Sequence, residues 1–196
     1  MALTTYTPGE VLTAASLNDN FTFAAANPPA GSSGLVCVKA ETAVSAAASA
    51  TADGIFTSAY TNYLLLVNFT TSGDQLCIKF RASGVSTSSN YATQQMLIDG
   101  TSITASRVTS QAEIRIQQST GAESSSIIQI FNPQVAIPTR LTQHTALNIG
   151  NYTTGSQLNL RSSNQSALTA FDGIELLALT GNWTGNYAIY GYSNTV

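Results

Sequence analysis

Aromatic and amide side chains are concentrated near the C-terminus, in the stretch LTGNWTGNYAIYGYSN. Aromatic rings stack on sugar rings or on partner side chains, and amides reach hydroxyl groups, so this mixture suits a binding surface. The residues predicted to form a receptor or partner surface are Asn182, Trp183, Asn186, Tyr190 and Tyr192. The alternative is that Trp183 closes the end of a core, because strand alternation alone already sends Tyr187 and Tyr190 to opposite faces.

Carboxylates are the second group of side chains that could carry chemistry. Glycan hydrolysis uses two of them, about 5–9.5 Å apart. Asp99 and Asp172 each precede a glycine, which turn formation explains. The sequence alone does not place any two carboxylates at this separation, so hydrolysis is the least favoured function. The candidates are Asp53, Asp74, Asp99, Glu113, Glu123, Asp172 and Glu175.

Other catalytic and ligand-binding motifs are missing from the sequence. His144 is the only histidine, and no G-x-S-x-G nucleophile elbow occurs, so a surface or edge-strand histidine is expected. Cys37 and Cys77 lack the spacing of a metal site, and we expect both to be free thiols. We therefore predict a protein that is not an enzyme, with no catalytic, cofactor-binding or metal-binding residues.

The composition excludes some partners. Charged residues make up 9% of the 196 residues, and the seven basic ones are scattered singly from Lys39 to Arg161. Nucleic-acid binding needs clustered Lys and Arg, so we expect none. No stretch reaches the ~18 apolar residues of a membrane span. Ser and Thr, 23 and 26 residues, supply a neutral hydrogen-bonding surface.

From residue 34 onward, the elements that must position these residues are predicted to be strands. Alternation places Leu76, Ile78 and Phe80 on one face of a strand. Asp99-Gly100 predicts a hairpin with a type I′ turn, and the segment around His144 is expected to be loop or edge. Nine to eleven strands without intervening helices predict an all-β, antiparallel sandwich, jelly-roll-like, spanning residues 34–196.

Residues 1–33 are predicted to form a helical arm and a linker. Thr7-Pro8-Gly9-Glu10 matches a capping box, and NPPAGSSG then breaks the periodicity. A helix this short is marginal alone in water, so it needs its own domain, a symmetry mate or another protein. The predicted assembly or anchor residues are Val11, Leu12, Leu17, Phe21 and Phe23.

Three stretches carry a resemblance to a known family. The opening LTTYTPGEVLTAASLNDNF, the middle FTSAYTNYLLLV and the closing GNYAIYGYSN resemble small virion proteins of tailed bacteriophages that infect marine bacteria and cyanobacteria. Such proteins are often labelled tail-fibre or minor structural proteins. The closing strand pattern is carried by Gly185, Tyr190, Gly191 and Tyr192. The resemblance implies a place in the phage particle, after synthesis in the host cytoplasm, and it brings no catalytic residues.

The function expected from these observations is a non-enzymatic structural part of a tail fibre or spike. Its arm would attach to other virion proteins or form a homotrimer, and its β-domain would adhere to a host-surface glycan or protein. The alternative is a capsid decoration protein that stabilises the shell. A glycan-degrading tail spike is the third, least favoured function.

Overall fold

The computed structural model describes residues 13, 15, 34–116, 123–148 and 156–193. By internal contacts the chain divides into two units, residues 1–34 with 193–196, and Leu35–Tyr192. All thirteen elements among the described residues are strands. They are β1 (Gly34–Ala47), β2 (Ser49–Ala52), β3 (Asn62–Thr71), β4 (Leu76–Ala82), β5 (Val85–Ser86), β6 (Tyr91–Asp99), β7 (Ser102–Gln111), β8 (Ile114–Arg115), β9 (Glu123–Phe131), β10 (Thr139–Asn148), β11 (Ser156–Gln165), β12 (Gly173–Ala178) and β13 (Trp183–Ser193).

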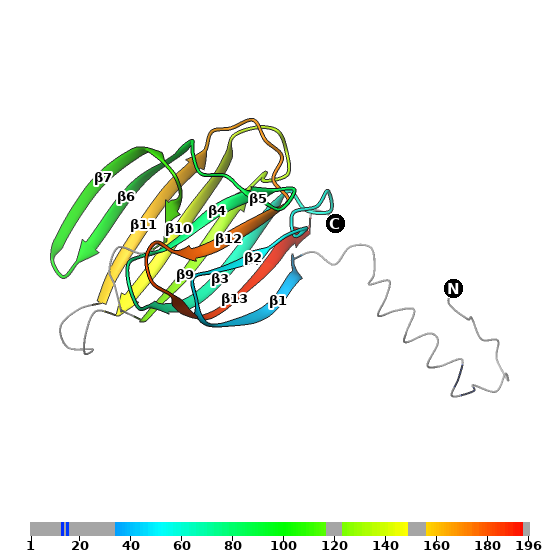
Figure 1. Ribbon diagram of the computed structural model, residues 1–196, viewed down its shortest axis with the longest axis horizontal. Helices are drawn as coiled ribbons and strands as arrows, with labels where there is room; N and C mark the ends of the chain where they lie inside the picture. Colours follow the sequence, from blue (N-terminus) through cyan, green and yellow to red (C-terminus); the bar gives the residue numbers. More distant parts are fainter. Residues whose placement is uncertain (1–12, 14, 16–33, 117–122, 149–155, 194–196) are drawn as a thin grey trace. The chain divides into compact units, whose positions relative to one another are not determined.

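The strands form two sheets in a sandwich-like arrangement (Figure 1). Sheet A has eight strands in the order β1-β13-β3-β9-β10-β11-β6-β7, and sheet B has the order β2-β12-β4-β5, with β8 also paired to β4. Every pair whose register is described is antiparallel. The predicted all-β class and antiparallel pairing are therefore confirmed.

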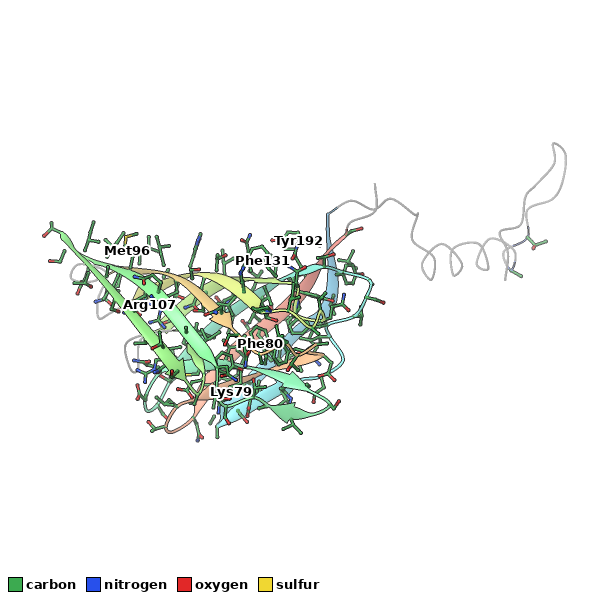
Figure 2. All side chains as sticks on the ribbon, turned by 90° about the horizontal axis from the view of Figure 1, so that it is seen from above. Lys79, Phe80, Met96, Arg107, Phe131 and Tyr192 are labelled. Atoms are coloured by element: carbon green, nitrogen blue, oxygen red, sulfur yellow. The ribbon has the colours of Figure 1, made fainter. Side chains whose placement is uncertain are left out.

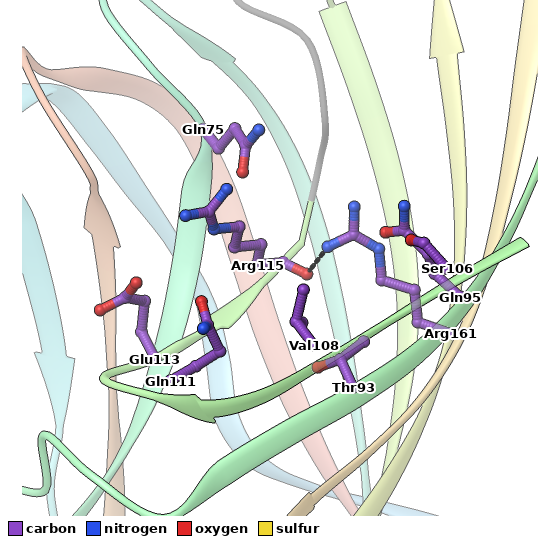
Figure 3. Close-up of a pocket in the computed structure, with 9 residues that line it drawn as sticks. All are labelled: Gln75, Thr93, Gln95, Ser106, Val108, Gln111, Glu113, Arg115 and Arg161. Atoms are coloured by element: carbon purple, nitrogen blue, oxygen red, sulfur yellow. Dashed lines mark hydrogen bonds between the residues drawn. The ribbon is translucent and has the colours of Figure 1, made fainter.

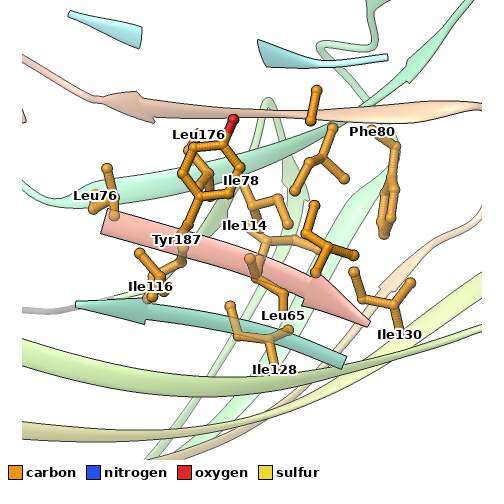
Figure 4. Close-up of a cluster of buried hydrophobic side chains, with 14 of the residues drawn as sticks. Leu65, Leu76, Ile78, Phe80, Ile114, Ile116, Ile128, Ile130, Leu176 and Tyr187 are labelled. Atoms are coloured by element: carbon orange, nitrogen blue, oxygen red, sulfur yellow. The ribbon is translucent and has the colours of Figure 1, made fainter. Parts of the chain in front are cut away.

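Alternation along the strands builds an apolar core between the sheets. On β4, Leu76, Ile78 and Phe80 are fully buried, as predicted, while Lys79 lies on the opposite face (Figure 2). Residues of β3, β9, β12 and β13, together with Ile114 and Ile116, belong to the same cluster (Figure 4). The rings of Phe80 and Phe171 stack with centroids 5.1 Å apart.

The inner face of sheet A changes character halfway across. We call β13, β3 and β9 the apolar half, because one cross-strand row there reads Ile189, Leu65, Ile128. We call β10, β11 and β6 the polar half, because the same row continues as Gln143, Arg161, Gln95. Apolar inner residues persist in the polar half near one end, at Leu141 and Tyr91. Gln143 is fully buried and Arg161 nearly so.

Two local predictions are wrong. The hairpin between β6 and β7 exists, but Asp99 pairs with Ser102, so the loop residues are Gly100 and Thr101. Of these two, only Gly100 has positive φ, 57°, which fits a type II′ turn rather than type I′. His144 lies in β10, between β9 and β11, and not in a loop or edge strand. The ladder accommodates Pro138 because that residue precedes the strand.

The remaining sequence expectations concern strand number and the arm. The structure has more strands than the nine to eleven predicted, partly because β5 and β8, of two residues each, carry no recognisable alternation. The predicted arm and linker, residues 1–33, lie outside the described residues except for positions 13 and 15. Within the described part of the chain, no helix is long and apolar enough to cross a membrane.

Candidate arginine pocket

The short strand β8, at an edge of sheet B, is held against sheet A by side chains of the polar half. Gln143 Nε2 and Thr145 Oγ1 both donate to the carbonyl oxygen of Ile116, the latter over 3.0 Å. Arg161 donates from a terminal guanidinium nitrogen to the carbonyl oxygen of Arg115. On the other side, the Ile116 N–H donates to the carbonyl oxygen of Leu76 over 2.7 Å. Polar residues of sheet A therefore satisfy backbone carbonyls at an edge of sheet B.

A cavity of about 360 Å³ opens beside this clamp (Figure 3). We call it the arginine pocket. Strands β6, β7, β8 and β11 contribute most of its wall, and its two cations come from β8 and β11. Figure 3 shows the Arg161 guanidinium beside the backbone carbonyl of Arg115, to which it donates. The lining residues are Gln75, Thr93, Gln95, Ser106, Val108, Gln111, Glu113, Arg115 and Arg161.

Arg161 is buried without a carboxylate beside it. Its side chain is 6% exposed, and its Nε donates to Asn159 Oδ1 over 3.2 Å. Arg81–Asp53 is the one ion pair among the described residues, so Arg161 has none there. Burial, opposed by Cys77 and assisted by the charge of Arg115, lowers the pKa of the Arg161 guanidinium to about 10. A buried charge without a counter-charge is costly, so this end of the pocket favours an anion.

The other lining groups can exchange hydrogen bonds with a polar ligand. Thr93 and Ser106 offer hydroxyls, Gln95 and Gln111 offer amides, and Val108 is the one apolar side chain among the described lining residues. Glu113 is the one carboxylate in that described set, and it is 8% exposed. The described residues contain no group of three or more His, Cys, Asp or Glu side chains that could hold a metal ion. The arrangement suits binding of an anionic, hydroxyl-rich ligand.

The predicted C-terminal surface is divided between two faces of β13. Trp183 is 1% exposed and packs in the core, with its ring 6.4 Å from that of Tyr187. Trp183 therefore closes the end of the core. The prediction that it belongs to an accessible receptor or partner surface is wrong. Tyr190 and Tyr192 are half-buried on the outer face of sheet A, and Asn182 is exposed in the turn before β13.

Hydrogen bonds tie the outer residues of this group to neighbouring strands. Asn68 Nδ2 donates to Asn186 Oδ1 over 3.1 Å, and Asn186 Nδ2 donates to Glu41 over 3.3 Å. Gln129 Nε2 donates to the Tyr192 hydroxyl over 3.3 Å. Asn186, Tyr190 and Tyr192 thus share one sheet face, but they lie on the opposite side of sheet A from the arginine pocket.

The glycines of the closing motif have packing roles on the inner face of β13. A Cβ at Gly191 would lie 2.4 Å from Cγ of Tyr60, whose ring covers that position. A Cβ at Gly185 would lie 1.9 Å from the carbonyl oxygen of Asn68. Only glycine permits such close approach. Part of the motif that carries the family resemblance is therefore explained by packing alone.

The outer face of the polar half exposes apolar side chains. One cross-strand row there reads His144, Leu160, Met96, and Met96 and Leu158 are exposed. The row continues into the apolar half at Ile127, which is 51% exposed. Figure 2 shows Met96 and Tyr192 on this side of sheet A. This half of the sheet is polar on its inner face and partly apolar on its outer face. The alternation of SQLNLRS is therefore present, but its apolar residues face outward.

The predicted anchor residues Val11, Leu12, Leu17, Phe21 and Phe23 lie outside the described residues. Cys37 is exposed and Cys77 buried, and both are free, as predicted. The arginine pocket was not predicted from the sequence. Its one sequence signal is the polar set Asn159, Arg161 and Ser163 at period two within β11.

The chain matches no protein-family model, no curated protein and no solved structure.

Proposed function

We propose that this protein is a non-enzymatic structural component of a tailed-phage particle, in a tail fibre or spike, whose β-domain binds a host-surface ligand. The observation that carries the ligand-binding part is the arginine pocket, a polar cavity of about 360 Å³ with a buried, unpaired cation in its wall. Cavities of this size hold small ligands. The place in a phage particle rests on the resemblance of the three quoted stretches.

Several features support binding over hydrolysis. A glycosidase places two carboxylates across the scissile bond, and the pocket lining has one, Glu113. The second half of the site consists of two arginines, which orient anions and do not activate water at neutral pH. A ligand held this way is bound and not cleaved.

Attachment through the N-terminal arm belongs to the same proposal. The predicted helix of the arm needs a partner, and a homotrimer would bring three arms together. Three copies would also present three pockets, so weak individual contacts would add up through effective concentration. The jelly-roll-like connectivity expected for the β-domain is a further part of this proposal.

Localisation of the chain in a reconstruction of the phage particle tests the function. Density in a tail fibre or spike supports the proposal. Density repeated on the shell lattice would instead identify a capsid decoration protein. Binding of the purified full chain to host cells, followed by fluorescence labelling, tests adhesion separately, and cells that remain unlabelled at micromolar protein would contradict it.

A further inference from the structure

We propose that the arginine pocket binds the carboxylate of an acidic sugar, with Arg161 and Arg115 on the carboxylate and Glu113 accepting hydrogen bonds from sugar hydroxyls. This inference rests on the proposed adhesive function and names the chemical class of its ligand. It is argued from the buried cation, from the second cation beside it, and from the composition of the remaining wall.

The buried cation defines the anionic part of the ligand. Arg161 lies on β11, and two of its nitrogens donate hydrogen bonds. One goes to the side-chain oxygen of Asn159 and the other to the backbone carbonyl of Arg115. Both partners are neutral, and no described carboxylate forms an ion pair with Arg161. A guanidinium binds a carboxylate in a planar, bidentate way, which makes the carboxylate a fitting partner.

The second cation strengthens this preference. Arg115 is exposed and follows the buried Ile114 in the edge strand β8. Arg115 and Arg161 line the same pocket, so their like charges repel each other. An anion between them removes the repulsion and gains two attractive interactions.

The rest of the wall determines what carries the carboxylate. Hydroxyl and amide groups predominate, and Glu113 adds an acceptor for hydroxyl donors. A fatty acid or an aromatic acid would need more apolar surface than Val108 supplies. A sugar acid combines one carboxylate with several hydroxyls, and about 360 Å³ accommodates a sugar ring of that kind.

Binding to the purified full chain tests this inference by isothermal titration calorimetry. The probes are methyl glycosides of glucuronate, galacturonate and N-acetylneuraminate, methyl glucoside and methyl galactoside as neutral counterparts, and inorganic phosphate. We expect at least one acidic sugar to bind and its neutral counterpart to bind tenfold to a hundredfold more weakly, about the worth of a charged hydrogen bond.

Variants assign the binding to the pocket. Arg161→Gln and, independently, Arg115→Gln should each weaken binding of the acidic sugar by tenfold or more. Arg107→Gln and Arg140→Gln are the matched controls, because they remove the same charge from exposed positions outside the pocket lining. Since Arg115 is exposed, its variant should fold normally even if the Arg161 variant does not.

Several outcomes would overturn the inference. These are the failure of every acidic sugar to bind at millimolar concentration, equal loss in the control variants, or phosphate binding as tightly as the best sugar. The outcome for sugar binding and the outcome for the proposed function can be distinguished. If the wild type and the Arg115→Gln variant label host cells equally, adhesion stands and the pocket is not its site. If acidic sugars bind but no tail density is found, the pocket stands and the place in the particle does not.

Discussion

The apolar half and the polar half of sheet A are built from strands of similar length in one continuous sheet, yet their inner faces differ. In the apolar half, the inner row Ile189, Leu65 and Ile128 packs in the core with residues of sheet B. In the polar half, the same row becomes Gln143, Arg161 and Gln95, and it faces the clamp on β8 and the arginine pocket.

The difference separates stability from binding within one domain. Burial of apolar area is the main favourable term in folding, and it is concentrated where sheet B covers sheet A. The polar half buries groups that contribute little unless their hydrogen bonds are satisfied, and one of them is an unpaired charge. A fold retains such a group where it serves a ligand, because the energetic consequence is small beside the rest of the core.

Truncation in the apolar half should have the largest effect on stability. Leu65 is fully buried in β3, so Leu65→Ala should lower the free energy of unfolding by about 2–5 kcal/mol. Urea unfolding followed by tryptophan fluorescence measures it. Ile127→Ala is the control, because this side chain is 51% exposed and its loss should change stability by less than about 1 kcal/mol. Equal losses at both positions would contradict the assignment of stability to the covered inner face of the apolar half.

A methyl group at Gly191 should have the next largest effect. It would collide with the ring of Tyr60, so Gly191→Ala should destabilise the domain by about 1–3 kcal/mol. The double variant Gly191→Ala, Tyr60→Ala should recover part of that loss relative to the sum of the single variants, because the colliding ring is gone. Strict additivity in the double-mutant cycle would show that another contact requires the glycine.

Alkaline pH should destabilise the protein through Cys77. Burial raises the pKa of this thiol from 9.0 to about 12, so the folded state keeps a proton that the unfolded state loses above pH 9. Stability therefore falls as pH rises, by about 1 kcal/mol between pH 9 and 10, before the tyrosines, with an ordinary pKa of 10.0, contribute fully. Urea midpoints at the two pH values measure the slope.

Cys77→Ala should remove the part of that slope that the thiol contributes, about 1 kcal/mol, and leave the part due to Tyr63, Tyr91 and Tyr187, whose pKa values burial also raises. Cys37→Ala is the matched control, because it deletes a thiol at an exposed position. Persistence of the full slope in the Cys77 variant would assign the alkaline loss to other groups.

The two halves also explain which strand faces could be predicted from the sequence and which could not. Alternation predicted that Leu76, Ile78 and Phe80 of β4 share one face, and in the structure all three are buried in the core. In β11 the same period is present, but Leu158 and Leu160 point away from the pocket side and Asn159 and Arg161 point toward it. Periodicity gives two faces and does not say which face is covered.

The arginine pocket could not be predicted from the sequence, for a related reason. Arg115 and Arg161 are 46 positions apart in the chain and meet only because β8 is placed beside the polar half. The group that composition did single out, around Trp183, is divided by alternation into a core residue and outer-face residues. Spacing along one strand could predict that division, whereas contact between strands required the fold.

Replacement of Arg161 should have the smallest effect on folding, and it tests the comparison most directly. Arg161→Met removes an uncompensated buried charge and keeps most of the side-chain volume, while it leaves the Arg115 carbonyl and Asn159 with one partner fewer. These contributions oppose each other, so the free energy of unfolding should change by less than about 1 kcal/mol in either direction. A loss of 3 kcal/mol or more would show that Arg161 stabilises β8 as a structural residue. An unchanged midpoint together with lost sugar binding would separate the two halves, because the residue could then be removed from the binding site without cost to the fold.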